Sequence, residues 1–108
     1  MQALPVLQPI CCGPDVAPLE REASERLAAR FKALADPTRV AIVNALSASD
    51  EVCVCNLTAT FQLSQPTISH HLKILRHAGL VEASRRGTWA YCRLVPEAID
   101  ALRGALGR

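Results

Sequence analysis

Polar and apolar positions follow a helical period between residues 64 and 79. At about 100° per residue, Ile68, Leu72 and Leu75 fall on one stripe together with Gly79. Ser64 is a suitable N-cap, and Gly79 can supply the left-handed residue that ends a helix. The pattern therefore predicts an amphipathic helix with defined start and stop signals.

The opposite face of this segment is rich in hydrogen-bond donors. All three histidines of the chain lie in the segment, and the polar face consists of Pro66, Thr67, His70, Lys73 and His77, with Gln65 and Arg76 along one edge. A helix that is apolar behind and donor-rich in front suits insertion into the major groove of DNA. An ordinary solvated helix surface has a similar composition, so this face alone leaves both interpretations open.

Two segments with the pattern of β-strands follow the helix. They cover residues 80–85 and 88–94, and Arg86-Gly87 at their junction marks the tip of a hairpin. Helix, helix and then a hairpin with a basic tip is the order of a winged helix-turn-helix domain. In such a domain the second helix enters the groove and the wing contacts phosphate.

The first and last helices have apolar stripes of their own. The first helix is expected to begin near Pro18 and the last at Pro96, and their apolar residues are Leu19, Ala23, Leu27, Phe31 and Leu34 in the first and Ile99, Leu102 and Leu106 in the last. Such faces commonly form a dimer interface, although they could equally cover the core of a single chain.

Two more helices are expected between these elements. Asp36-Pro37 is an N-cap and first-turn pair that opens a helix through Val40, Val43 and Leu46. Residues 47–52 form a polar connection, and a short helix covers roughly residues 55–62, with Leu57 and Phe61 facing inward. The expected fold is mainly α with a small β-hairpin, an α+β winged helix-turn-helix.

The length of 108 residues corresponds to one domain. Residues 1–16 contain three prolines and no helical period, so we expect a flexible, cysteine-bearing N-terminal arm before a DNA-binding and dimerisation domain at residues 17–108. No apolar run approaches a membrane span, and the first residues lack the features of a signal peptide. A cytoplasmic location is expected, where thiols stay reduced and serve as ligands or sensors.

Positive charge is concentrated in the predicted helix and hairpin. Residues 64–93 hold five basic side chains and one acidic side chain, a net charge of +4, whereas residues 1–63 have a net charge of −2. Such clustering is expected of a phosphate-binding surface. Because the local excess is small, a dimer that presents two such surfaces to a palindromic site is the more plausible working unit.

Cys53 and Cys55 form a candidate ion-binding pair. In an extended segment, residues two apart point to the same side, whereas in a regular helix they lie about 200° apart. Both thiols can therefore reach one ion only if the start of the short helix is extended or unwound. The nearby helix N-terminus favours the thiolate, which is the form that binds metals.

Two sulfurs leave a thiophilic ion under-coordinated, and Cys11 and Cys12 in the arm could supply the rest, including from a partner protomer. Cys92 lies within the second hairpin strand, where a buried packing role is preferred. His70 and His77 could in principle bind a metal, but their place on the presumed groove face favours DNA contact.

Together these motifs resemble the ArsR/SmtB family of metal-sensing winged-helix repressors. Residues 31–94 are similar to that family, the sequence LSQPTISHHLKILRHAGLV at residues 63–81 is close to its recognition-helix pattern, and residues 35–39 match the opening of its second helix. Residues 51–57, EVCVCNL, resemble the metal box of the arsenic and cadmium/lead sensors.

The resemblance implies a homodimeric repressor, not an enzyme, that binds operator DNA when empty and releases it when metal binds. It also implies the residues that face DNA, which are Gln65, Thr67, Ser69, His70, His71, Lys73 and Arg76, with Arg85 and Arg86 at the wing. The corresponding metal ligands are Cys11, Cys12, Cys53 and Cys55.

This chain departs from the family patterns at two places. Thr58 stands where the arsenic-type box usually has a third cysteine, and the last helix lacks the histidine of the zinc and nickel sensors. Cysteines from an N-terminal arm resemble the cadmium/lead branch and some arsenic sensors.

All-sulfur donors select soft ions. Trivalent arsenic or antimony is therefore the expected inducer, with cadmium or lead as the alternative. A thiol-based redox switch without metal remains a second alternative. A thiol oxidoreductase is disfavoured because the chain lacks a Cys-x-x-Cys motif and an evident general base.

Overall fold

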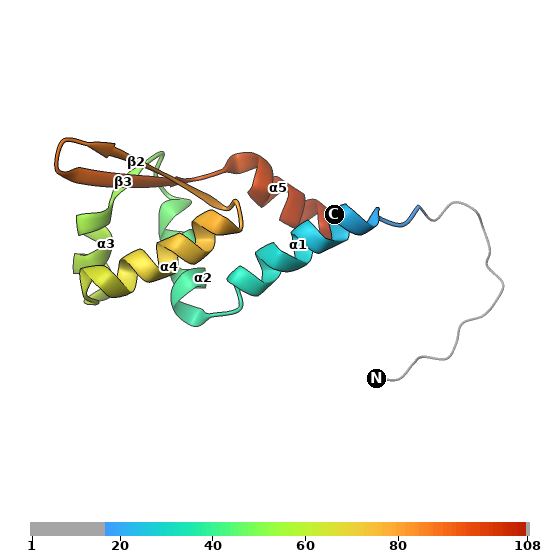
Figure 1. Cartoon of the computed structure of the whole chain (residues 1–108), viewed down its shortest axis with the longest axis horizontal. Helices are drawn as coiled ribbons and strands as arrows, with labels where there is room; N and C mark the ends of the chain where they lie inside the picture. The colour runs from blue at the N-terminus through green and yellow to red at the C-terminus, as the bar shows by residue number, and fades with distance from the viewer. Residues whose placement is uncertain (1–16, 108) are drawn as a thin grey trace.

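The computed structural model describes residues 17–107, which form five helices around a small sheet (Figure 1). In chain order the elements are α1 (Arg21–Ala33), α2 (Pro37–Leu46), β1 (Val52–Cys53), α3 (Val54–Phe61), α4 (Gln65–His77), β2 (Val81–Arg86), β3 (Trp89–Leu94) and α5 (Pro96–Ala105). The expected fold, mainly helical with an antiparallel hairpin after the helix-turn-helix, is confirmed.

Helix α4 has the start and stop signals that its sequence predicts. The Ser64 side chain accepts a hydrogen bond from the Thr67 backbone N–H at 3.3 Å, and Pro66 lies in the first turn. Gly79 follows the helix in a left-handed conformation with φ of +80°. Ile68, Leu72 and Leu75 are all buried, as the apolar stripe predicts.

The sheet has three strands, in the order β1-β3-β2, with both pairs antiparallel. Strand β1 was expected to be part of a polar connection and the start of a helix, and that expectation was wrong because Val52 pairs with Cys92 and Cys53 with Tyr91. The hairpin tip is also shifted by one residue from the predicted Arg86-Gly87. Arg86 pairs with Trp89, so the two-residue turn is Gly87-Thr88.

The core lies where α2, α3, α4 and α5 meet the sheet. Its largest fully buried side chains are Ile42, Leu46, Leu57, Ile68, Leu75, Leu80 and Cys92. In α2 the predicted stripe is confirmed at Leu46, and Val43 packs beside the core, but Ile42 is fully buried in place of Val40, which is 50% exposed. Phe61, expected to face inward, is only half-buried beside this core.

The outer helices leave part of their predicted apolar stripes uncovered in the single chain. Helix α1 begins at Arg21 after the N-cap Glu20, so Leu19 precedes the helix, and this side chain is 56% exposed. Phe31 is 37% exposed, and Leu106, beyond the end of α5, is 77% exposed. The single chain therefore does not bury these three side chains, and they are available to a partner.

Helices of the described region are too short or too polar to cross a membrane.

Replacing a core side chain of α4 tests the assignment of its buried face. Leu75→Ala should lower the free energy of unfolding by about 2–5 kcal/mol, because it removes methyl groups from a filled core. Lys73→Ala, on the exposed face of the same helix, should change it by less than about 0.5 kcal/mol. Urea denaturation at fixed protein concentration measures both. Equal effects of the two substitutions would contradict the assignment.

Candidate nucleic-acid interface and thiol site

Helices α3 and α4 form the helix-turn-helix. The turn depends on Gln62, which adopts a left-handed conformation with φ of 56° and ψ of 41° directly after α3. Ser64 then caps α4, so three residues separate the two helices. This short connection fixes the second helix against the first, as DNA-reading helices require.

The outward face of α4 presents a continuous row of polar side chains. The residues expected there that are exposed are Gln65, Thr67, Ser69, His70, Lys73 and Arg76. These side chains offer amide, hydroxyl, imidazole, ammonium and guanidinium donors to a groove. His71 differs from them, because it is half-buried and its Nδ1 lies 3.1 Å from Nη1 of Arg39.

Two arginines hold the rear of α4. Arg39, at the start of α2, donates from Nε to the carbonyl oxygen of Ala33 at 2.6 Å and reaches His71 with its other nitrogen. Arg30 of α1 donates from Nε to the carbonyl oxygen of Ala78 at 3.1 Å. A Cβ atom at Gly79 would lie 3.3 Å from Nη2 of the same arginine. Helices α1 and α2 thus fix the angle of the outward face.

The two arginines expected at the wing have different surroundings. Arg85 is exposed and, among residues 17–107, has no ion pair or hydrogen-bonded side-chain partner. Arg86 donates from Nη2 to Oε1 of Glu51, and its guanidinium lies 4.2 Å from the centre of the Tyr91 ring. The Glu51 carboxylate raises the pKa of Arg86 above its ordinary value. Of these two arginines, Arg85 is therefore the one without a side-chain partner among residues 17–107.

Cys53 and Cys55 lie together where β1 becomes α3. Cys53 is the N-cap, with extended backbone angles (φ −69°, ψ 137°), and Cys55 is in the first turn. The extended start that shared ion binding requires is therefore present. A hydrogen bond from the Cys55 thiol lowers the pKa of Cys53, and the same contact together with partial desolvation raises the pKa of Cys55.

Cys92 has the packing role that its place in the hairpin predicts. It is 1% exposed, and its thiol points to the backbone oxygen of Val52 at 3.6 Å. Burial raises the pKa of Cys92 to about 11, so the neutral thiol persists at physiological pH. This sulfur stabilises the β1–β3 contact and is a poor ligand.

The donors present fit a soft ion but do not complete its coordination. Within residues 17–107, no cluster of three or more His, Cys, Asp or Glu side chains is placed to bind a metal. The position of the missing third cysteine holds Thr58, whose hydroxyl donates to the Cys55 carbonyl oxygen at 2.8 Å. Cys11 and Cys12, the other candidate ligands, lie outside the described residues.

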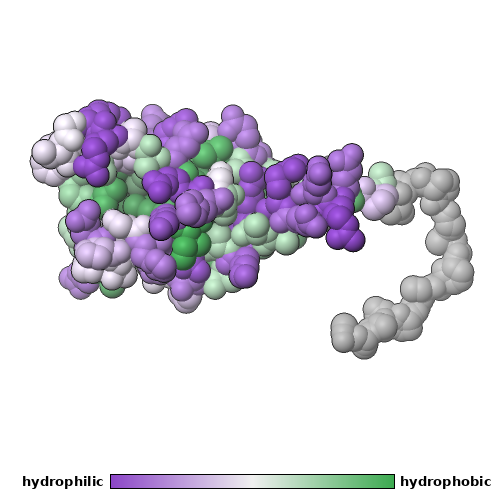
Figure 2. All heavy atoms as spheres, in the orientation of Figure 1, coloured by the Kyte–Doolittle hydropathy of each residue, from purple (hydrophilic) through white to green (hydrophobic). Residues whose placement is uncertain are grey.

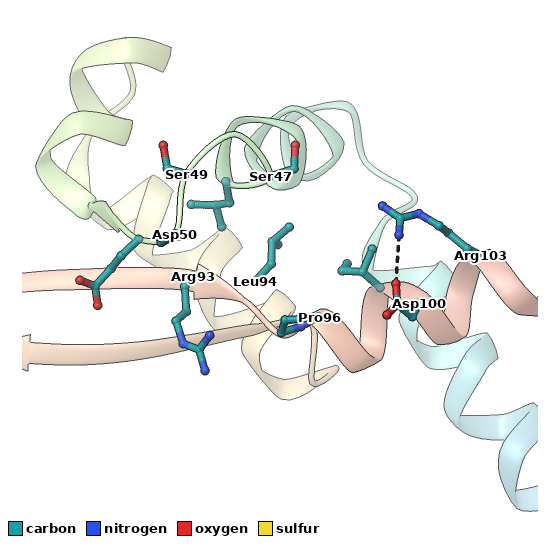
Figure 3. A pocket seen from close by; sticks show the side chains of 11 residues that line it. Ser47, Ser49, Asp50, Arg93, Leu94, Pro96, Asp100 and Arg103 are labelled. Atoms are coloured by element: carbon teal, nitrogen blue, oxygen red, sulfur yellow. Dashed lines mark hydrogen bonds and ion pairs between the residues drawn. The ribbon is translucent and has the colours of Figure 1, made fainter.

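A further hollow lies elsewhere, between the end of α2, β3 and α5 (Figure 3). Its volume is about 530 Å³, and its polar lining consists of hydroxyl, carboxylate and guanidinium groups, with Arg103 paired to Asp100 at 3.0 Å. Because neither sulfur nor imidazole lines it, this hollow is unsuited to a thiophilic ion.

Four residues of these sites were not anticipated from the sequence: Arg30, Arg39, Glu51 and Tyr91. Three of them act through a partner distant in the chain, 48 residues away for Arg30, 32 for Arg39 and 35 for Glu51, whereas Tyr91 contacts Arg86 across the hairpin. Local periodicity holds no signal for such contacts. Only the register of β1 on β3 and the crossing of α1 over α4 reveal them.

Comparison with known proteins gives concordant results. Residues 36–83 match the family model described as "Bacterial regulatory protein, arsR family". An uncharacterized HTH-type transcriptional regulator of Methanocaldococcus jannaschii is 42% identical over 81 residues, which are 75% of this chain and 91% of that protein. The arsenical resistance operon repressor of Bacillus subtilis is 42% identical over 73 residues, covering 68% of this chain and 70% of the relative.

A cadmium resistance regulatory protein CadC homolog of Staphylococcus aureus is 39% identical over 72 residues, 67% of this chain and 60% of that protein. Among solved structures, a homodimeric winged helix-turn-helix DNA-binding domain from Mycobacterium bovis superposes with a TM-score of 0.66 at 33% identity. The match covers 80% of this chain and 79% of that one.

The opposite pKa shifts of the half-buried Cys53 and the exposed Cys55 predict an order of reactivity. Cys53 should be alkylated by iodoacetamide at lower pH than Cys55, because its pKa is lowered and that of Cys55 is raised. Cys92 should react only after unfolding. Peptide-resolved mass spectrometry over a pH series measures all three. In Cys53→Ser, the midpoint of Cys55 alkylation should fall, and an unchanged midpoint would contradict the contact.

Proposed function

This chain belongs to the ArsR family of DNA-binding transcriptional regulators, and we propose that it is a homodimeric repressor released from its operator by trivalent arsenic or antimony. The observation that supports the effector most directly is the position of Cys53 and Cys55 at the junction of β1 and α3, with Cys53 as an extended N-cap and Cys55 in the first turn. This thiol pair is part of the first helix of the helix-turn-helix, so an ion bound there acts directly on the reading element.

Operator recognition is assigned to α4 and the wing. The exposed side chains of α4 (Gln65, Thr67, Ser69, His70, Lys73 and Arg76) reach base edges and phosphates, and Arg85 contacts the backbone from the hairpin. His71 contributes from behind, by fixing α4 through Arg39. The net charge of +4 over residues 64–93 is available to displace counterions from DNA.

Dimerisation is assigned to the outer helices. Helices α1 and α5 contact one another (Figure 1), and a hollow of about 310 Å³ between them is lined mainly by Leu19, Ala23, Leu27, Ala101, Gly104 and Ala105. Figure 2 shows hydrophilic residues over the hairpin tip and hydrophobic surface left between polar patches. A second copy would cover the exposed Leu19, Phe31 and Leu106 and place two reading helices on a palindromic site.

The partner protomer is the more suitable source of the remaining sulfur ligands. Helix α1 has 13 residues and is therefore about 20 Å long, and its first residue and α3 lie at opposite ends of the described molecule (Figure 1). The five-residue step from Cys12 to Ala17 spans at most about 18 Å. We therefore assign the remaining sulfur ligands to Cys11 and Cys12 of the other copy.

Sulfur number decides between the candidate ions. Trivalent arsenic or antimony requires three sulfurs in a pyramid, which Cys53, Cys55 and one arm thiol supply. Cadmium or lead is the second candidate, because both arm thiols together with the pair would make a four-sulfur site, and one relative is named for cadmium resistance.

The release follows from the different affinity of the ion for two conformations. Cys53 and Cys55 hold their sulfurs together only when the start of α3 is extended, and a ligand that tightens this geometry biases the position of α3 and therefore of α4. DNA must in return weaken ion binding by the same factor.

Removing one sulfur of the pair tests the proposal. For the wild type, arsenite should weaken operator binding by about fivefold or more, the lower range of known coupling energies. Cys55→Ser should bind the operator as the wild type does in the absence of ion, and arsenite should change its affinity by less than about twofold. Fluorescence anisotropy with a labelled operator measures both. A fully retained ion response in Cys55→Ser would refute the site.

Two controls separate the alternatives. Cys92→Ala retains both surface thiols and should respond to arsenite as the wild type does. Native mass spectrometry distinguishes a retained ion, arsenic or cadmium, from the mass change of thiol oxidation. A response that accompanies oxidation without retained ion would replace the metal sensor by the redox switch.

A further inference from the structure

The wing and the thiol-bearing strand are joined by an ion pair that the fold alone does not require. Glu51 immediately precedes β1, and Arg86 is the last residue of β2, on the far side of β3. Arg86 reaches across β3 to bind the Glu51 carboxylate, and both side chains remain partly exposed. This contact therefore spans all three strands of the sheet.

Tyr91 of β3 holds the arginine between these strands. Its ring lies beneath the Arg86 guanidinium at 4.2 Å, a distance typical of cation–π attraction. Tyr91 is also the residue opposite Cys53 in the β1–β3 pairing. Glu51, Arg86 and Tyr91, called here the wing clamp, are thus linked in register to the first sulfur of the thiol pair.

We propose that Glu51 competes with DNA phosphate for Arg86, and that Cys53, two residues further along the chain and part of β1, controls this competition. A guanidinium binds carboxylate and phosphate through the same N–H groups, and the two anions repel one another at close range. Arg86 therefore binds phosphate more strongly when Glu51 gives up its hydrogen bond. Arg85 contacts phosphate in either state.

The effect of an ion follows from the position of Cys53. When both thiols are tied to a ligand, β1 stays paired with β3, and Glu51 stays against Arg86 at the wing. When the thiols are free, the two-residue strand is less restrained and Arg86 exchanges more readily to phosphate. Ion binding and wing contact then oppose each other, as linkage requires. This part rests on the proposed function, whereas the competition for Arg86 does not.

The competition is tested without any ion by comparing two isosteric substitutions. Glu51→Gln removes the competing charge, and operator affinity should rise about two- to fivefold, the value of an exposed ion pair. Glu82→Gln is the matched control, since it removes the same charge from the same sheet but frees Arg93, which Glu82 binds at 2.8 Å. An equal rise in both variants would reflect net charge alone and would overturn the proposal.

A double-mutant cycle identifies the arginine involved. Arg86→Ala should cost more operator affinity in the Glu51→Gln background than in the wild type, because only there is Arg86 fully available. Arg85→Ala should cost the same in both backgrounds. If the cost of Arg86→Ala is independent of Glu51, the competition is absent.

The link to the thiols is read from the ion response of the same variants. Arsenite should weaken the operator binding of the wild type and of Glu82→Gln by a certain factor. For Glu51→Gln this factor should be smaller by at least about twofold. The single tryptophan, Trp89, pairs with Arg86 and is exposed, so its emission reports the wing directly. An equal ion response in all three proteins overturns the link to Cys53. A wild type that does not respond to the ion refutes the proposed function instead, and the ion-free comparison still decides the role of Glu51.

Discussion

The pairing of two residues, Val52 and Cys53, with the middle of β3 is the contact on which the arrangement of both sites depends. It adds a third strand to the hairpin and fixes the first turn of α3 against the sheet. The same pairing keeps Cys53 in the extended conformation that places its sulfur beside Cys55, and it brings Glu51 within reach of the wing. On the core side of this pairing, the buried Cys92 thiol contacts the backbone oxygen of Val52.

The exposed polar face of α4, the proposed DNA-binding surface, is positioned by contacts on the opposite side of the helix. Helix α4 buries Ile68, Leu72 and Leu75 and is tied at two further points by arginines from α1 and the start of α2. The buried apolar face limits the rotation of α4 about its axis, and these two polar contacts restrict it further. Together they determine which side chains of α4 face outward. The reading surface is consequently a product of α1 and α2 as much as of α4.

The sequence was sufficient for elements whose signals are local. Helix α4 has a cap, a period and a glycine stop within 16 residues, and the hairpin has two β-rich runs around a glycine, so both were predicted to within a residue or two. Strand β1 could not be predicted, since two residues show no period and its stability comes entirely from β3. The extended start of α3 was stated only as a condition for shared ion binding, and the β1 pairing meets it.

Other features depend on contacts across the fold or between chains. The Glu51–Arg86 pair joins residues 35 apart, and the half-burial of His71 results from Arg39, so neither follows from the pattern around it. The apolar stripe of α1 was identified, and a single chain packs Leu27 and Leu34 of it beside the core but leaves Leu19 and Phe31 exposed. The exposed part is available to a second chain.

The junction after α4 has a mechanical consequence for target choice. Gly79 is held in its left-handed conformation with Arg30 directly above it, so the glycine serves as a closed corner and not as a hinge. Helix and hairpin are therefore joined in a fixed arrangement, and under the proposed function this arrangement sets the distance between the base pairs that α4 contacts and the phosphates that the wing contacts. Substitutions on the surface of α4 can change which DNA sequence is preferred. A change in the length of DNA that is contacted would require a different connection between α4 and the hairpin.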